Sequence, residues 1–203
     1  MRRFRHGLLL SLLLSISLSA QAFTFEDWQA RQAANPAFKS RIEYSRWLAE
    51  PELRIHADGK LYFTPFESLL WQWYSPVPRI DEITITGKRF NDTSPESAKL
   101  DPLLMQNDGL PSERQIARFL IRIHQGDLES LKAKYDIRLQ GEPDAWQLVM
   151  EPRQEAPESL RRILLEGGRF ITLLSIETKT GNALRVRLTK HQPLVDGKVA
   201  GEP

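Results

Sequence analysis

The chain contains no cysteine. This absence excludes disulfide bonds, thiol catalysis and metal sites built from thiolates. It also leads us to expect no lipidated N-terminus, because a bacterial lipoprotein needs a cysteine directly after its leader peptide. We therefore expect the fold to be held together by the burial of its side chains alone.

Acidic residues are missing from the first 22 positions, where three arginines precede an apolar run from Leu8 to Leu18. The run is followed by Ala20-Gln21-Ala22, which is a small-x-small cleavage signal. This order predicts a secretory signal peptide over residues 1–22 and a mature chain that begins at Phe23. The alternative is an uncleaved membrane anchor, but a spanning helix needs about 20 apolar residues, and Leu8–Leu18 is shorter.

Neither sign of charge is in excess once this leader is set aside. The chain has 28 basic and 26 acidic residues. The leader holds three of the basic residues and no acidic residue, so 25 basic and 26 acidic residues remain. A nucleic-acid-binding protein would concentrate basic residues on one face, and we expect no such partner. The remaining 181 residues suffice for one domain with a substantial core.

Residues that carry chemistry are also scarce. The mature chain has three histidines, His56, His124 and His191, and no Gly-x-Ser-x-Gly, His-x-His or His-Glu-x-x-His pattern. The sequence therefore predicts no catalytic residue, no metal-binding residue and no cofactor. A lipid-processing enzyme of the esterase type stays open as an alternative, and it would need His56 or His124 in a Ser–His–acid set.

Hydrophobic periodicity predicts a mostly β protein with a few short helices, an α+β fold class. Alternation of period two indicates strands. The predicted strands cover residues 38–48, 53–57, 61–63, 69–73, 83–85, 135–139, 145–151, 161–166, 169–178 and 183–189. Asp58-Gly59 is interpreted as a hairpin turn, residues 91–102 as a loop, and residues 191–203 as a disordered tail.

Two helices carry clear start signals. Thr24-Phe25-Glu26-Asp27 resembles a capping box and predicts a helix that ends near Asn35-Pro36. Ser112 is expected to cap an amphipathic helix that Gly126 ends, and a shorter helix is expected over residues 128–134. The apolar face of the amphipathic helix has the spacing i, i+3, i+4, i+7 and consists of Ile116, Phe119, Leu120 and Ile123.

Hairpin-length connections predict that the strands form one antiparallel sheet, and a sheet of this size curls. One face carries wide apolar side chains, whereas the other carries charges such as Arg185 and Arg187. The amphipathic helix would cover the concave side. The wide apolar side chains are either packed core and nothing more, or the wall of an apolar pocket for an acyl chain. These side chains are Phe63, Trp71, Trp73, Trp146, Met150 and Phe170.

The order of several loose motifs resembles a known family. These motifs are Gly59 to Pro65 followed by Leu69-Leu70-Trp71 and Pro76; Ile123-His124-Gln125-Gly126-Asp127; Trp146 to Pro152; and a last hairpin of Phe170–Ile176, Gly181 and Leu184–Leu188. In this order and spacing, the chain from Phe38 to Leu188 resembles the periplasmic carriers of outer-membrane lipoproteins (LolA-type). Thr64 departs from the pattern, because typical carriers have there an arginine that tethers the lid.

The resemblance implies a soluble periplasmic carrier domain over residues 23–190: a half-open antiparallel barrel, covered on its concave side by helices that act as a lid. It implies an acylated lipoprotein or another exported lipid as cargo, a membrane donor and an outer-membrane acceptor as partners, and a monomer. The implied cavity lining is Leu61, Phe63, Leu69, Trp71, Trp73, Ile83, Ile85, Trp146, Leu148 and Met150, and the implied lid face is Ile116, Phe119, Leu120 and Ile123. A ligand-free structural or interaction module stays open as a further alternative.

Overall fold

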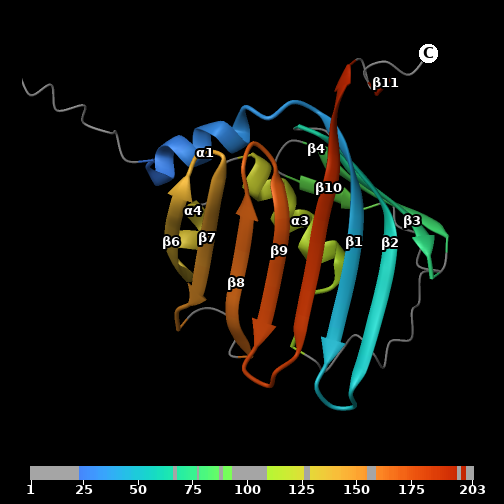
Figure 1. Cartoon of the computed structure of the whole chain (residues 1–203), viewed down its shortest axis with the longest axis vertical. Helices are drawn as coiled ribbons and strands as arrows, with labels where there is room; N and C mark the ends of the chain where they lie inside the picture. The colour runs from blue at the N-terminus through green and yellow to red at the C-terminus, as the bar shows by residue number, and fades with distance from the viewer. Residues whose placement is uncertain are drawn as a thin grey trace, which may run out of the picture.

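A large antiparallel sheet makes up most of the protein (Figure 1). The computed structural model describes residues 23–65, 68–76, 78–86, 89–92, 109–125, 129–154, 159–195 and 198–199. The strands are β1 (Phe38–Leu48), β2 (Leu53–Thr64), β3 (Ser68–Ser75), β4 (Arg79–Thr86), β5 (Arg89–Asp92), β6 (Tyr135–Glu142), β7 (Ala145–Pro152), β8 (Leu160–Gly167), β9 (Ile171–Thr178), β10 (Ala183–Val195) and β11 (Lys198–Val199). The helices are α1 (Phe25–Ala33), α3 (Glu113–His124) and α4 (Glu129–Lys132).

The sheet is an open path of strands. The order is β5-β4-β3-β2-β1-β10-β9-β8-β7-β6, and β11 pairs only with β10. In Figure 1, β6 to β2 spread across the front, β3 and β4 turn behind them, and α3 and α4 lie behind the front strands. The predicted fold class is therefore confirmed. The chain forms a curved antiparallel sheet, an incomplete barrel with short helices on its concave side.

Alternation along the strands decides which side chains face the helices. In β1 the even positions are buried, among them Phe38, Ile42, Tyr44 and Leu48. The odd positions are half-buried or exposed and form the convex face. This assignment agrees with the period-two pattern in the sequence. The sheet thus has one polar convex face and one largely apolar concave face, in which Ser40 and Arg46 of β1 are also buried.

The hairpin turn expected at Asp58-Gly59 is wrong. β2 runs without a break from Leu53 to Thr64, and the turn from β1 lies at residues 49–52. The pairing of β1 with β2 continues through Gly59, and the buried positions keep the same phase on both sides of it. The Asp-Gly pair instead marks a bulge in the pairing with β3, where the register shifts. A Cβ atom on Gly59 would collide with the backbone oxygen of Gln72, so this close approach requires glycine.

The disordered tail expected after Lys190 is also wrong for residues 191–195 and for residues 198–199, which form β11. β10 continues to Val195 and pairs with the start of β1, with Pro193 opposite Phe38. The backbone N–H of Leu194 donates to the carbonyl of Ala37 at 2.8 Å. A bulge at Lys190 changes which side chains of β10 face inward. The period-two pattern of the preceding residues therefore does not continue through residues 191–195. Residues 91 and 92 of the expected loop belong to β5. The predicted signal peptide, the rest of that loop and Gly126 lie outside the described residues.

Both predicted helix starts are confirmed. Thr24 Oγ1 accepts from the Asp27 N–H at 3.1 Å, and Asp27 Oδ2 accepts from the Thr24 N–H at the same distance. Ser112 and Gln115 exchange the equivalent pair of bonds at the start of α3. These capping boxes satisfy N–H groups that have no partner within the helix. They fix where α1 and α3 begin.

Candidate ligand-binding cavity beneath helix α3

Helix α3 presents one apolar side to the concave face of the sheet. Ile116, Leu120 and Ile123 are fully buried, and Phe119 is half-buried against the same core. A stripe of this width on a helix of three turns is the pattern of a helix that packs against a core. Its polar side, with Arg114, Arg118 and Arg122, is exposed or half-buried.

A cavity of about 400 Å³ lies between the first half of α3 and strands β8 and β9. Its lining is Gly109, Leu110, Pro111, Gln115, Ile116, Phe119, Tyr135, Leu160, Ile163 and Ile176. None of these lining residues carries a full charge at neutral pH. The volume falls within the ~300–1,000 Å³ that is usual for small-molecule sites. The cavity is therefore suited to an uncharged apolar group.

Two polar side chains at the cavity have restricted chemistry. Burial raises the pKa of the Tyr135 hydroxyl, so this group stays neutral and can donate one hydrogen bond. The side-chain oxygen of Gln115 already accepts from the backbone N–H of Ser112 at 2.8 Å. The cavity thus offers little to a charged ligand.

Most of the predicted cavity residues lie elsewhere on the concave side. Leu61, Phe63, Leu69, Trp71, Trp73, Trp146, Leu148 and Met150 are each 2% exposed or less and belong to one packed core. None of them borders the cavity beneath α3. The side chains of Ile83 and Ile85 lie outside the described residues. A role of this set in ligand binding stays a prediction.

The predicted lid face divides between the two environments. Ile116 and Phe119 border the cavity, whereas Leu120 and Ile123 pack into the core. The structure therefore brings two of the four predicted lid residues to the hollow part of the concave side.

The second half of α3 ends in a packed aromatic cluster. His124 lies 4.5 Å from Phe63 and 5.3 Å from Phe38, measured between ring centroids. His191 stacks on Phe170 at 4.9 Å, with an angle of 4° between the rings. Burial lowers the pKa of His124 to about 3, and the nearby His191 contributes to the same shift. His124 is therefore neutral at physiological pH, and its ring behaves as part of the core.

Sequence reasoning missed the walls that β8 and β9 contribute. Leu160, Ile163 and Ile176 were not among the predicted lining residues, all of which lie on β2, β3, β4 and β7. Alternation along β8 and β9 does place Ile163 and Ile176 on the concave face, where they are paired across the two strands. The signal was present in the period-two pattern, but nothing in it distinguishes a cavity wall from a filled core.

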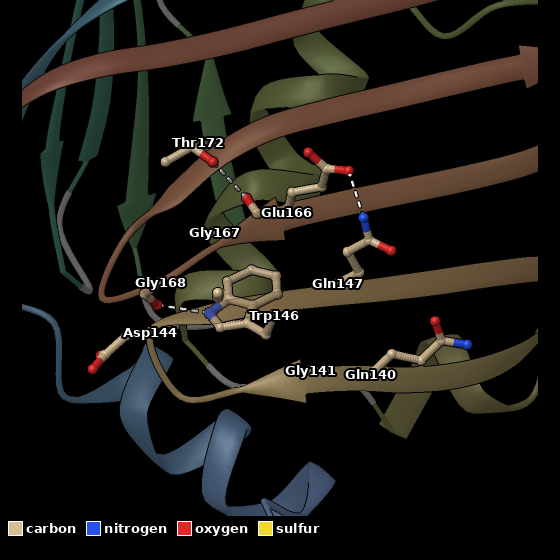
Figure 2. A pocket seen from close by; sticks show the side chains of 10 residues that line it. Gln140, Gly141, Asp144, Trp146, Gln147, Glu166, Gly167, Gly168 and Thr172 are labelled. Atoms are coloured by element: carbon tan, nitrogen blue, oxygen red, sulfur yellow. Dashed lines mark hydrogen bonds between the residues drawn. The ribbon is translucent and has the colours of Figure 1, made fainter.

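A second hollow, of about 540 Å³, lies on the convex side near the ends of the β6–β7 and β8–β9 hairpins (Figure 2). Half of its ten lining residues are polar, and three are glycines. Gln147 donates to Glu166 at 2.9 Å, and Trp146 Nε1 donates to the carbonyl of Gly168 at 2.6 Å. This more open and polar hollow is a poor match for an acyl chain. Trp146 also lines this hollow beside the glycines of the hairpins, although its side chain is buried and packs against Trp28.

His56, His124 and His191 do not gather at this apolar cavity. His56 lies on the convex face, where Nε2 is 3.1 Å from Asp58 Oδ2 and the side chain is 59% exposed. His124 is enclosed by aromatic rings, as described above. Among the described residues, no group of three or more His, Asp or Glu side chains could hold a metal ion.

No protein-family model matches this chain, and no curated protein sequence matches it. Several solved structures are similar in fold. A chain of the crystal structure of MucB in complex with MucA(peri) has a TM-score of 0.46 and 14% identity, over 84% of this chain and 57% of that one. A LolA superfamily protein from Nitrosomonas europaea has a TM-score of 0.39 and 10% identity, over 86% and 95%. A DUF1329 family protein from Desulfovibrio piger has a TM-score of 0.37 and 12% identity, over 84% and 92%.

The LolA-type match agrees with the resemblance found in the sequence. At these identities the matches concern the fold alone, and at TM-scores below 0.5 they add nothing to the argument about function. This chain spans a little over half the length of the MucB-complex chain. Within the part of the chain that the structure describes, no helix is long and apolar enough to cross a membrane.

Proposed function

We propose that this protein is a soluble periplasmic carrier, which holds an acyl chain of a lipoprotein or of another exported lipid in the cavity beneath α3. It passes that cargo from a donor at the inner membrane to an acceptor at the outer membrane, and it performs no chemistry. The observation that carries the proposal is the cavity itself: about 400 Å³, without a charged side chain, and roofed by an amphipathic helix.

The energetics of acyl-chain burial support a carrier with a movable roof. Each CH₂ group moved from water to an apolar site is worth ~0.8 kcal/mol. A sixteen-carbon chain would therefore gain roughly 10 kcal/mol before the costs of binding are subtracted. A rigid closed site would hold such a chain too tightly to deliver it. Release is favoured when α3 lifts and the cargo moves to a tighter acceptor.

The position of α3 is suited to this movement. Its first half borders the cavity through Ile116 and Phe119, whereas its last turn is fixed by the rings around His124. We infer that the helix pivots about its C-terminal end and that Ile116 and Phe119 withdraw when cargo enters.

An esterase remains a second candidate because of one observation on the convex face. Ser45 is the direct cross-strand neighbour of His56, and His56 contacts Asp58. These residues are the types of a Ser–His–acid set. However, the His56 side chain is mostly exposed, and hydrolytic sites usually exclude water from the reacting groups. Hydrolysis of a chromogenic ester that His56→Ala abolishes would favour this candidate.

The carrier proposal is tested by the lipid that accompanies the protein. Mass spectrometry of protein purified from its native periplasm is expected to find a lipid or lipoprotein and to identify it. The mature N-terminus of the same sample is expected to be Phe23. Protein that is free of lipid, and that also binds no fluorescent fatty acid in vitro, would contradict the proposal.

A matched pair of variants locates the binding site. Ile163→Phe puts a larger ring into the cavity, whereas Leu164→Phe adds the same ring type one residue along β8, on the opposite face of the sheet. We expect Ile163→Phe to weaken binding of a fluorescent fatty acid at least tenfold, and Leu164→Phe to leave it within twofold of the parent. Equal effects of the two variants would place the lipid elsewhere.

A further inference from the structure

A second binding site lies on the convex face, across the sheet from the acyl-chain cavity. Strands β1, β2, β3 and β10 enclose a half-open hollow of about 400 Å³ there. Four cationic side chains, Lys39, Arg41, Lys60 and Lys190, line it together with a single carboxylate, Asp58. The excess of positive charge over so small an area distinguishes this hollow from the uncharged cavity beneath α3.

The register of the sheet places like charges side by side in this hollow. Arg41 on β1 is directly opposite Lys60 on β2, and both side chains are on the convex face. Like charges in directly opposed positions destabilise a pair of strands. An anion bound between them would remove that repulsion.

A β-bulge adds the fourth cation. Arg41 pairs with Thr189 and Lys39 with Gln192, so Ser40 faces both Lys190 and His191. Leu188 is buried, and in a regular strand residue 190 would lie on the same concave face. The bulge turns Lys190 outward, and its φ of 53° is a left-handed conformation that lysine rarely adopts. Backbone strain of this kind is concentrated at functional sites.

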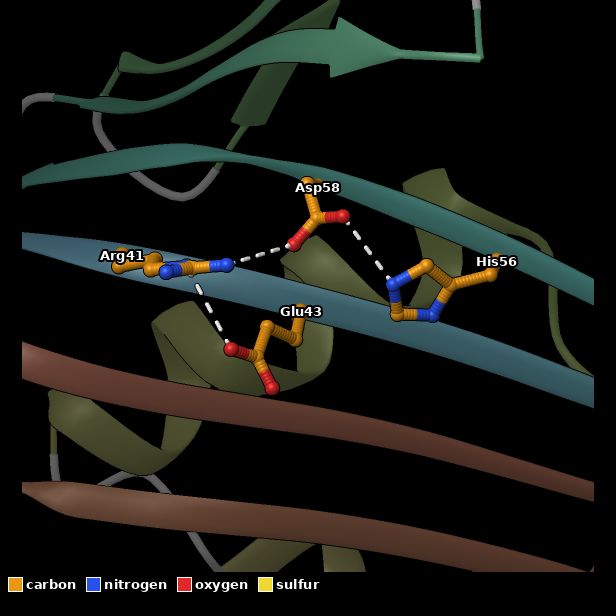
Figure 3. A network of polar contacts seen from close by, with 4 residues as sticks. All are labelled: Arg41, Glu43, His56 and Asp58. Carbon is orange, nitrogen blue, oxygen red and sulfur yellow. Dashed lines mark hydrogen bonds and ion pairs between the residues drawn. The ribbon is translucent and has the colours of Figure 1, made fainter.

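The one carboxylate of the hollow is already occupied. Asp58 Oδ1 is 3.2 Å from Arg41 Nη2, and Asp58 Oδ2 is 3.1 Å from His56 Nε2 (Figure 3). Arg41 Nε is also 3.4 Å from Glu43. This network holds the guanidinium of Arg41 in place on the face of the sheet that points away from α3.

Tyr74 is a further lining residue of the hollow. Lys60 lies over the ring of Tyr74, 5.6 Å from its centroid, and Tyr74 is 45% exposed. The ring orients an ammonium group, which suits a ligand that accepts hydrogen bonds from it.

We propose that this hollow binds a phosphate group. Phosphate offers oxygens on several sides to guanidinium and ammonium donors, and charge-assisted bonds to arginine and lysine are the strong ones. The group can belong to a soluble phosphate compound or to the head of an anionic lipid. Because the hollow and the acyl-chain cavity lie on opposite faces of the sheet, this site does not depend on the proposed carrier function.

The test is calorimetric titration of the exported protein with inorganic phosphate at low, fixed ionic strength. We expect saturable binding that Lys190→Gln and Lys60→Gln each weaken at least fivefold. Arg185→Gln is the matched control, because Arg185 is an exposed cation on the same face of β10 but does not line the hollow. Equal losses in all three variants would overturn the proposal, and so would absence of saturable phosphate binding together with absence of binding to anionic vesicles.

A second variant separates loss of the site from loss of the fold. Lys190→Gly removes the ammonium group and also permits the left-handed backbone at no steric cost. We expect phosphate binding to weaken at least fivefold while the thermal midpoint stays the same or rises. Parent-like phosphate binding by this variant would count against the site.

Vesicles distinguish the two sources of the phosphate. Co-sedimentation with phosphatidylcholine vesicles that contain phosphatidic acid, but not with phosphatidylcholine alone, and its loss in Lys190→Gln, would identify a lipid head group. Binding of inorganic phosphate without vesicle binding would identify a soluble phosphate compound. Either result supports the site, whereas failure of both arms refutes it.

Discussion

The two halves of the concave side are filled to different degrees. On the side of β1 to β3, Phe38 and Phe63 pack against each other and against His124 in the last turn of α3, and Trp71 packs against Trp73. On the side of β8 and β9, the aliphatic residues Ile163 and Ile176 leave a cavity beneath the first turns of the same helix. Large rings fill the space under a helix, and shorter side chains do not reach across it.

This difference gives one helix two kinds of attachment. The C-terminal end of α3 is embedded through His124, whereas its earlier turns border a hollow through Ile116 and Phe119. A lid needs this asymmetry, because a helix packed tightly along its whole length would not lift and one packed nowhere would not return. The predictions below test the contrast.

The largest expected effect is on stability in the filled half. We expect Phe63→Ala to lower the free energy of unfolding by about 4 kcal/mol, because it leaves a new void among packed rings. Ile163→Ala should cost about 2 kcal/mol, because this side chain already borders an empty volume. Urea denaturation of both variants measures the two values. Equal losses would mean that the halves are packed alike.

Acid should weaken the embedded end of α3. The unfolded chain protonates His124 near its usual pKa of 6.5, whereas burial lowers the pKa in the folded state to about 3. The unfolded state therefore binds more protons between these values, and stability falls as the pH falls through this window. At about pH 4.5 the loss due to His124 should be about 3 kcal/mol, at ~1.4 kcal/mol per pH unit. His191, whose pKa burial also lowers, adds a loss of the same sign.

Two variants isolate this contribution of His124. His124→Phe should remove most of the slope of stability against pH between pH 4 and 6.5, as measured by urea denaturation at several pH values. His56→Gln serves as the control, because that side chain is exposed on the convex face. A slope that is unchanged in His124→Phe would show that the acid sensitivity originates elsewhere.

Cargo should change the loose end of α3 more than the embedded end. On addition of a fatty acid, we expect amide hydrogen exchange to change about tenfold, equivalent to ~1.4 kcal/mol, around Ile116 and Phe119. Exchange around Ile123 and His124 should change little. Mass spectrometry after pepsin digestion resolves the two ends. Exchange that stays the same throughout α3 would argue against a lid.

The smallest expected effect concerns the convex face. Lys190→Gly should raise the free energy of unfolding by about 1 kcal/mol, because glycine adopts a positive φ without the cost that lysine bears. Lys39→Gly, at a position of β1 whose φ is not positive, should instead lower it by about 0.5–1 kcal/mol. If both glycines destabilise the protein, the bulge is not strained.

Local signals in the sequence predicted the helix starts and the faces of most strands. Thr24 and Ser112 determine where two helices begin, because a cap depends on residues only three positions apart. The turn predicted at Asp58-Gly59 is wrong because this dipeptide is only a local turn signal. The period-two alternation of buried side chains continues through it from Ala57 to Leu61. A pairing partner far along the chain, β3, decided what that dipeptide does.

The site was harder to predict than the fold. Alternation showed that Phe63 and Trp73 face inward, and they do. It could not show that rings fill one half of the concave side while Leu160 and Ile163 leave the other half open, because packing density depends on the shapes of side chains from distant strands. The bulge at Lys190 was equally hidden, because it appears only when β10 is paired with β1.

The sheet ends at β5 on one side and β6 on the other, and among the described strands no backbone ladder joins these two edges. The spacing between them is therefore set by side chains and by α3, not by main-chain hydrogen bonds. The distance between β5 and β6 can therefore increase or decrease without breaking a backbone hydrogen bond between neighbouring strands. If the protein carries acyl cargo as proposed, a wider cargo would require only the repacking of side chains, and cargoes of different width would share one protein.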